Sequence, residues 1–198
     1  MNHSEFAKQL RAIAGTSVGW PFVCDGSPFD CQIALVGINP ATDVPLWPNW
    51  SNGAGVNKAG WLQDYITRYK KYTPTRARIE RLVKAIAPAR VLETNIIHHY
   101  SARESDLPKE LRRSTEVFDY LIATLKPKVL LVHGRSAVRH LQRLTSTDFV
   151  RGEFASVRYR NVAFDVLAHH HLSYQWSFAK VDELGRTLRR RLEAVPAV

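Results

Sequence analysis

The chain has 198 residues, 45% of them hydrophobic, so it can bury one substantial core but has little room for a second independent domain. Its 28 Lys and Arg outnumber 18 Asp and Glu, and the net charge of +10 favours a polyanionic partner such as nucleic acid. The alternative is that this charge serves only to keep the protein soluble. Two cysteines are too few for a four-thiolate cluster, and no window forms a signal core or could cross a bilayer, so we expect a cytoplasmic protein without an iron–sulfur cluster.

The first half of the chain predicts helices from apolar residues at helical spacing and strands from short apolar runs. A Thr73 cap followed by Pro74 marks the start of one helix. Three prolines and a glycine-containing run predict an irregular loop over Ile38–Asn57. The predicted elements are a helix at 4–13, a strand at 31–36, a helix covering 61–69, a helix at 73–85 and a strand at 90–96.

The second half continues the same alternation of helices and strands. The predicted elements are a helix at 114–125, a strand at 129–133, a helix starting at 134–136, a hairpin of strands at 154–159 and 162–167, and a basic amphipathic helix at 177–192. Alternating strands and helices are typical of βα units that feed a mostly parallel sheet. The sequence therefore predicts a single α/β domain over residues 1–198.

Two strand ends carry polar residues suited to a ligand site. The apolar strand that ends near Val36 runs into a Gly37-Ile38-Asn39-Pro40 turn, and a later strand ends in His169-His170-His171-Leu172-Ser173. Open α/β sheets bind ligands at the carboxyl ends of their strands, because several strands deliver side chains there from a rigid base. We therefore expect the two segments to share one cleft.

These segments resemble motifs of the uracil-DNA glycosylase superfamily. The 37–40 turn is similar to the first motif of the branches that carry Asn, and 171–173 is similar to the closing His-Pro-Ser motif, with Leu172 in place of Pro. Glu93-Thr94-Asn95 stands where the family has a strand-end Asn, and 129–141 resembles its strand–Gly–helix segment. Ala41 stands where the family usually has Gly. Its methyl group would hinder the close approach of the backbone to a nucleotide that Gly allows.

The resemblance implies a three-layer α/β/α sandwich around a mostly parallel four-stranded sheet. It also implies a monofunctional DNA N-glycosylase that works in base-excision DNA repair as a monomer, without cofactor or metal. Such an enzyme flips a base out of DNA, hydrolyses its N-glycosidic bond and leaves an abasic site. The base could be uracil, hypoxanthine, or a damaged or hypermodified pyrimidine, and the sequence leaves this choice open.

The chemistry of the reaction assigns roles to two residues. Cleavage of an N-glycosidic bond needs stabilisation of charge on the departing base and a water on the opposite face of the sugar. The amide oxygen of Asn39 could hold that water, although it is not a strong base. A neutral His171 could donate a hydrogen bond to the base oxygen on which negative charge develops. We therefore predict that both residues are catalytic.

Base recognition is assigned to four further residues. Asn95 offers a donor and an acceptor to the edge of a pyrimidine, or else it satisfies a turn at its strand end. The resemblance also places Ile38 against the base. Trp47 or Trp50 could stack on the flipped base, and each could equally anchor its loop by hydrophobic packing.

DNA contacts are expected on both sides of the closing motif. The resemblance implies that a loop with Tyr174, Gln175 and Trp176 enters the duplex as a wedge, whereas the alternative packs Trp176 under the last helix. The candidate backbone contacts are Arg135, Ser136, His170 and Ser173.

Two other readings of the sequence remain. Eight histidines invite a metallohydrolase, but neighbouring residues of a strand point to opposite faces and rarely supply three ligands to one ion. A catalytically silent relative could also use the basic cleft for DNA binding alone. Competent chemistry at Asn39, Asn95 and His171 favours the enzyme.

Overall fold

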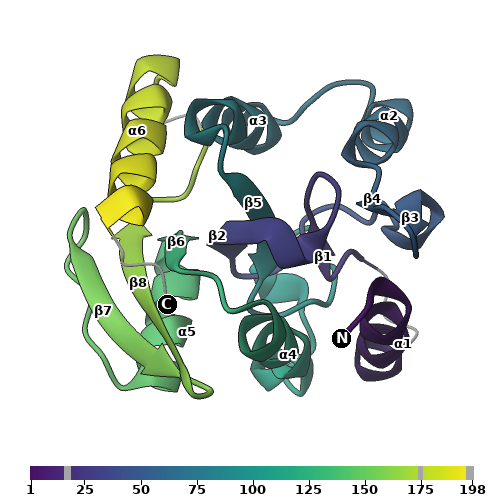
Figure 1. The fold of residues 1–198 in the computed structure, drawn as a ribbon, viewed down its shortest axis with the longest axis horizontal. Coiled ribbons are helices and arrows are strands. Elements are labelled where there is room, and N and C mark those ends of the chain that lie inside the picture. Colours follow the sequence, from purple (N-terminus) through teal and green to yellow (C-terminus); the bar gives the residue numbers. More distant parts are fainter. Residues whose placement is uncertain (16–18, 174–175, 195–198) are drawn as a thin grey trace.

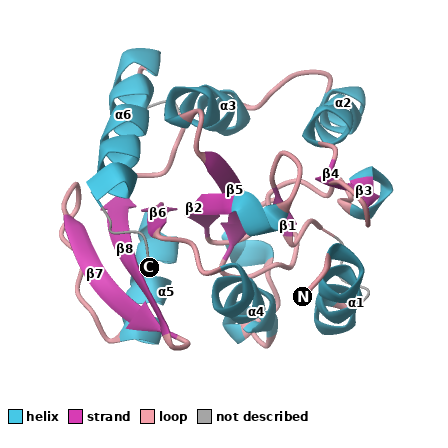
Figure 2. Cartoon of the chain, viewed as in Figure 1, coloured by secondary structure: helices cyan, strands magenta, loops and turns pink. Residues whose placement is uncertain are grey.

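A mixed six-stranded sheet forms the centre of the molecule (Figures 1 and 2). The computed structural model describes residues 1–15, 19–173 and 176–194. In spatial order, the strands are β1 (Phe22–Val23), β5 (Arg90–Asn95), β2 (Cys31–Gly37), β6 (Val129–His133), β8 (Val162–His169) and β7 (Phe154–Tyr159). The four inner strands pair in parallel, and the two edge strands pair antiparallel to their neighbours.

The expected α/β class is confirmed, but the expected four-stranded, mostly parallel sheet is wrong. The hairpin arm β7 adds an antiparallel strand at one edge, and β1 adds another at the opposite edge. β1 has only two residues, which is too short for an alternating hydrophobic pattern to reveal it in the sequence.

Six α-helices lie around the sheet within the described part of the chain (Figure 1). Their bounds are α1 (His3–Ala14), α2 (Lys58–Tyr69), α3 (Pro74–Ile86), α4 (Glu116–Leu125), α5 (Arg135–Thr145) and α6 (Phe178–Ala194). Asn2, Asn57 and Thr73 cap α1, α2 and α3 with their side-chain oxygens, which satisfies one free N–H at each helix start. The predicted loop at 38–57 contains a small two-stranded sheet of β3 (Trp50–Ser51) and β4 (Gly55–Val56).

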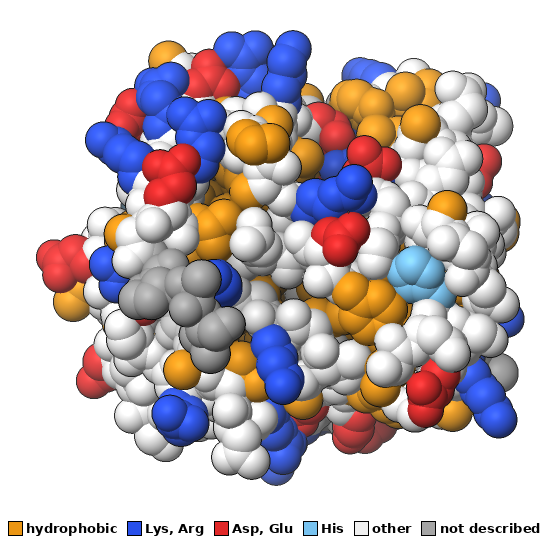
Figure 3. Space-filling view, viewed as in Figure 1, with side chains coloured by type: hydrophobic (Ala, Val, Ile, Leu, Met, Phe, Trp, Pro, Cys, Tyr) orange, Lys and Arg blue, Asp and Glu red, His pale blue; other side chains and the backbone are white. Residues whose placement is uncertain are grey.

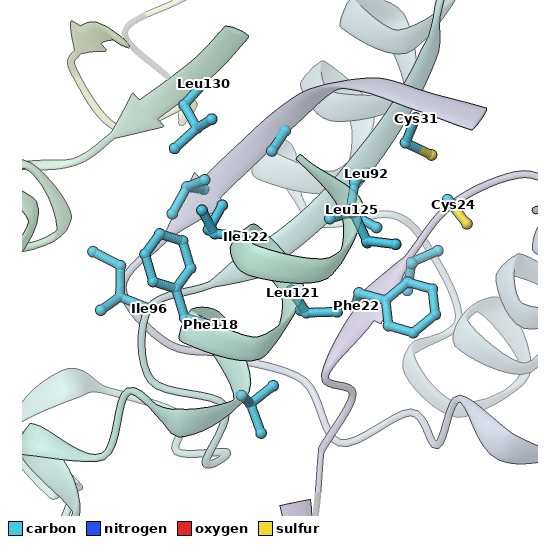
Figure 4. Close-up of a cluster of buried hydrophobic side chains, with 14 of the residues drawn as sticks. Phe22, Cys24, Cys31, Leu92, Ile96, Phe118, Leu121, Ile122, Leu125 and Leu130 are labelled. Atoms are coloured by element: carbon cyan, nitrogen blue, oxygen red, sulfur yellow. The ribbon is translucent and has the colours of Figure 1, made fainter. Parts of the chain in front are cut away.

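Both faces of the sheet are covered, and the residues of β2 show how. Ile33 and Leu35 face a cluster that includes side chains of α3 and α6, whereas Ala34 and Val36 face a cluster built with α1, α4 and α5. Successive side chains of a strand point to opposite faces, so a strand covered on both faces must be apolar throughout. Figure 4 shows part of the cluster built with α1, α4 and α5, where side chains of α4 such as Leu121 and Leu125 pack beside Leu92 of β5 and Phe22 of β1.

Candidate functional site

A cavity of about 240 Å³ opens at the carboxyl ends of the parallel strands. Its lining includes Ile38 and Asn39 after β2, Asn95 at the end of β5, His133 at the end of β6 and His171 after β8. Parallel strands all present their carboxyl ends at the same edge, so residues far apart in the sequence meet here. The structure thus brings together Ile38, Asn39, Asn95 and His171 from the set predicted to contact the base or the sugar.

Asn39 is held in one orientation by the segment after β5. Its Nδ2 donates to the carbonyl oxygen of Ser101 at 3.1 Å and to the Ser101 hydroxyl at 3.0 Å. The same nitrogen also lies 3.2 Å from the carbonyl oxygen of Pro40. With the NH₂ group used in this way, the amide oxygen is the atom of Asn39 left to orient a water or another ligand.

Asn95 lies across from Gly37 in the parallel register of β5 and β2. The residue is 5% exposed, and its Nδ2 is buried without a hydrogen-bond partner. A Cβ at position 37 would come within 2.6 Å of the Asn95 Oδ1, so the glycine is what allows the amide to lie against the backbone of β2. A buried unpaired donor costs free energy, and a ligand with an acceptor in the cavity would remove that cost.

Two histidine rings lie next to each other, with centroids 5.2 Å apart: His133 and His171. His133 is 6% exposed, and burial, with a smaller contribution from nearby His171, lowers its pKa to about 3. The His171 side chain is open to solvent, but partial burial of its ring still lowers its pKa below the ordinary value of 6.5. Both imidazoles are therefore neutral at pH 7 and act as hydrogen-bonding groups without charge.

The wall of the cavity beside Asn95 contains a buried network of charges that the sequence analysis missed. Glu93 is 2% exposed and forms ion pairs with Arg76 of α3 and with Lys58 of α2, the latter at 2.7 Å. Glu80 pairs with the same two cations, so two acids balance two bases. The signal in the sequence was a carboxylate in the middle of the predicted strand at 90–96, directly after Val91 and Leu92, which predicts a buried cation partner.

The tryptophan that lines the cavity is Trp20, and the two predicted ones lie elsewhere. Trp20 is 7% exposed and donates from Nε1 to the Thr42 hydroxyl at 3.2 Å. Trp50 packs against Phe6 of α1, and the Arg11 guanidinium lies 4.3 Å from the centre of the Trp47 ring. Neither Trp47 nor Trp50 lines the cavity, so their placement fits the loop-anchor alternative.

A basic groove of about 410 Å³ adjoins the cavity, and His171 lines both. Its lining brings together three cations and three polar residues of the closing segment: Arg135, Arg139, Arg151, His169, His170 and Ser173. Ser136 is half-buried in the first turn of α5 and does not line the groove. One surface thus holds the predicted contacts Arg135, His170 and Ser173. It also holds Arg139 and Arg151, which were not among the predicted contacts.

Trp176 occupies a different place from the predicted DNA wedge. It is 7% exposed in the cluster beneath α6, and its ring contacts His169 edge-on at 4.4 Å between centroids. Its backbone oxygen accepts a hydrogen bond from Arg78 Nε at 2.7 Å. This placement matches the alternative in which Trp176 packs under the last helix. Tyr174 and Gln175 lie outside the described residues.

No protein-family model matches the chain, and no curated protein matches it. No helix within residues 1–15, 19–173 and 176–194 combines the length and the apolar character needed to span a membrane. In the same residues, no group of three or more His, Cys, Asp or Glu side chains is arranged to hold a metal ion.

Proposed function

We propose that the protein is a DNA glycosylase that flips a uracil, a damaged pyrimidine or a modified pyrimidine out of DNA and hydrolyses its N-glycosidic bond. The observation that carries the proposal is the meeting of Asn39, Asn95 and His171 in one cavity, each from a different strand end. A volume of about 240 Å³ suits a single base, since pockets for larger organic ligands usually span roughly 300–1,000 Å³.

The roles of the three residues follow from their surroundings. The bond between C1′ and the base nitrogen breaks, and its electron pair leaves with the base. The neutral His171 donates a hydrogen bond to a base oxygen as this charge develops, while Asn95 Nδ2 donates to an acceptor on the edge of the base. The Asn39 oxygen, fixed through Ser101, orients the water whose oxygen bonds to C1′, and the proton of that water passes to solvent or to the departing base.

The basic groove supplies a path for the DNA backbone. It begins at His171, where the cavity opens, and it presents Arg135, Arg139 and Arg151 as exposed cations. Phosphate contacts of this kind fix the position of a duplex without reading its sequence. We further propose that the protein acts on DNA as a monomer, since residues of one chain line the cavity. We also propose a cytoplasmic location, which fits its two free cysteines.

A single-turnover excision assay tests the proposal. Labelled single-stranded and duplex oligonucleotides carry uracil, hypoxanthine or a modified cytosine, and alkali reveals abasic sites after incubation. We expect cleavage at one of these bases, a loss of at least about 100-fold in Asn39→Ala and His171→Ala, and no change in Asn52→Ala, an exposed control. Tight DNA binding without an abasic product would instead support a DNA-binding module that lacks catalysis.

A further inference from the structure

In the described part of the chain, the buried side-chain nitrogen and oxygen atoms without a hydrogen-bond partner belong to Asn95, His98 and His133. Two of these three residues, Asn95 and His133, line the same cavity. Folded proteins usually pair such atoms or expose them to water, because a buried unpaired donor or acceptor costs free energy. Their meeting in one cavity indicates that a ligand completes their hydrogen bonds.

His133 and Asn95 approach the same point of the backbone from neighbouring strands. A Cβ at Gly37 would lie 2.6 Å from Asn95 Oδ1 and 3.8 Å from His133 Cε1. The strand order β5-β2-β6 explains this arrangement, since β2 runs between the strands that carry the two residues. The two side chains therefore lie on either side of the end of β2, and both line the cavity.

The neighbours of His133 do not use its ring nitrogen Nδ1. His171 is close, but no hydrogen bond joins the two rings within the described residues. The ionic side chains of the wall are satisfied among themselves, because Glu93 bonds to Lys58 and Arg76. A neutral imidazole has one donor and one acceptor nitrogen, so His133 has hydrogen-bonding capacity to offer a ligand.

We infer that His133 is a second base-reading residue, which acts with Asn95 on one polar edge of a heterocyclic base; this inference rests on the proposed function. The base must present an acceptor to Asn95 Nδ2 and, beside it, a polar atom complementary to His133 Nδ1. A purely apolar ring of the same shape would leave both atoms unpaired, as they are without a ligand, and would therefore bind less tightly than a base that pairs them. No role is assigned to His133 from the sequence, because a His that follows four apolar residues is predicted simply to end a buried strand.

Binding of free bases tests the inference without requiring catalysis. Protein labelled with ¹⁵N in its His and Asn side chains is titrated with uracil, hypoxanthine and cytosine, and the spectra are followed at pH 7. We expect at least one base to shift both the His133 Nδ1 signal and the Asn95 amide signals. Benzene serves as the apolar control and should shift neither. If none of the three bases moves the His133 signal, the inference is wrong.

Variants separate a role in binding from a role in folding. His133→Leu should weaken binding of that base and lower kcat/KM about 10- to 100-fold, and His133→Gln should recover part of the loss because its amide restores a polar partner. The unfolding midpoint of His133→Leu should stay the same or rise, since an unpaired buried polar group is removed. His140→Leu, a histidine of α5 outside the cavity, is the matched control.

The two proposals fail in different ways. A base that shifts both signals but is never excised from DNA would retain the inference and contradict the glycosylase. Excision that proceeds in His133→Leu with wild-type kcat/KM would retain the glycosylase and contradict the inference. A lower unfolding midpoint in His133→Leu, with unchanged base binding, would show that His133 is only structural.

Discussion

The side-chain amide of Asn39 is fixed by Ser101, a residue 62 positions further along the chain. Asn39 Nδ2 donates to both the carbonyl oxygen and the hydroxyl of Ser101, at 3.1 Å and 3.0 Å. The Ser101 hydroxyl in turn donates to the carbonyl oxygen of Arg103 at 2.8 Å. These hydrogen bonds set which end of the amide faces the cavity, and the proposed role of the Asn39 oxygen in orienting a water requires that this oxygen be held in place.

Replacement of Ser101 should therefore slow excision without abolishing it. In Ser101→Ala the bond to the Ser101 carbonyl remains and the bond to the hydroxyl is lost, so we expect a rate about 3- to 10-fold lower and a stability loss of about 1 kcal/mol. Single-turnover rates and chemical denaturation measure the two effects. Ser105→Ala, at an exposed serine nearby, should leave the rate unchanged. A rate in Ser101→Ala equal to that of wild type would show that the amide needs no second anchor.

Gly37 is the position at which a single added methyl group should displace the side-chain amide of Asn95. In Gly37→Ala the new Cβ would contact a side-chain oxygen, Asn95 Oδ1, and not the backbone, so the amide should move while the sheet persists. We expect excision to fall about 10- to 100-fold and stability to fall by about 1–3 kcal/mol. Gly53→Ala is the matched control, because the nearest atom to its Cβ would be 3.8 Å away. Equal activity of the two variants would contradict the assigned role of Asn95.

Much of the fold could be predicted from periodicity. The strands at 129–133 and 154–159 have the predicted bounds, and the helix after Pro74 ends one residue later than predicted. β1 was missed because two residues carry no pattern, and it completes the sheet only by pairing with β5, far along the chain. Sheet size depends on such long-range pairing, which a local pattern does not encode.

The meeting of residues in the cavity was predictable where a motif stands at a strand end, as for Asn39, Asn95 and His171. It was not predictable where the partner comes from elsewhere in the fold. Trp20 lies before the first long strand, yet the fold places it on the cavity wall, whereas Trp47 and Trp50 turn toward α1. The sequence gives the residue type, and tertiary packing decides which aromatic ring reaches the site.

The ion pairs of Glu93 predict a loss of stability in acid. Burial alone would raise the pKa of Glu93, but attraction to Arg76 and Lys58 outweighs that cost and lowers it below the ordinary 4.5. Below about pH 4.5, the unfolded carboxyl binds a proton that the folded one does not, so stability should fall as the pH drops from there. Denaturation at pH 7, 5, 4 and 3 measures this trend.

Glu93→Gln should isolate the contribution of the network. It leaves Arg76 and Lys58 buried with one acid, Glu80, so we expect a loss of about 3–5 kcal/mol at pH 7. The gap between the variant and wild type should narrow toward pH 3, where the wild-type carboxyl loses its advantage. Glu183→Gln on the surface of α6 should leave stability unchanged. A gap that is the same at every pH would show that the charge of Glu93 is not its source.

The basic groove predicts how DNA affinity responds to salt. Each phosphate contact contributes about 0.9 to the steepness with which the logarithm of the DNA-binding constant falls with the logarithm of salt concentration. The double variant Arg139→Gln/Arg151→Gln removes two such contacts, so the slope should become shallower by about 1.8. The preference among bases should stay unchanged, because phosphate contacts do not read the base. Arg186→Gln/Arg190→Gln removes the same charge from α6, over which Lys and Arg side chains gather in Figure 3. These two arginines already pair with Glu183, so this control should change the slope little. Fluorescence anisotropy with a duplex at several salt concentrations gives both slopes. If the α6 pair changes the slope and the groove pair does not, the DNA backbone runs over α6 and the groove assignment is wrong.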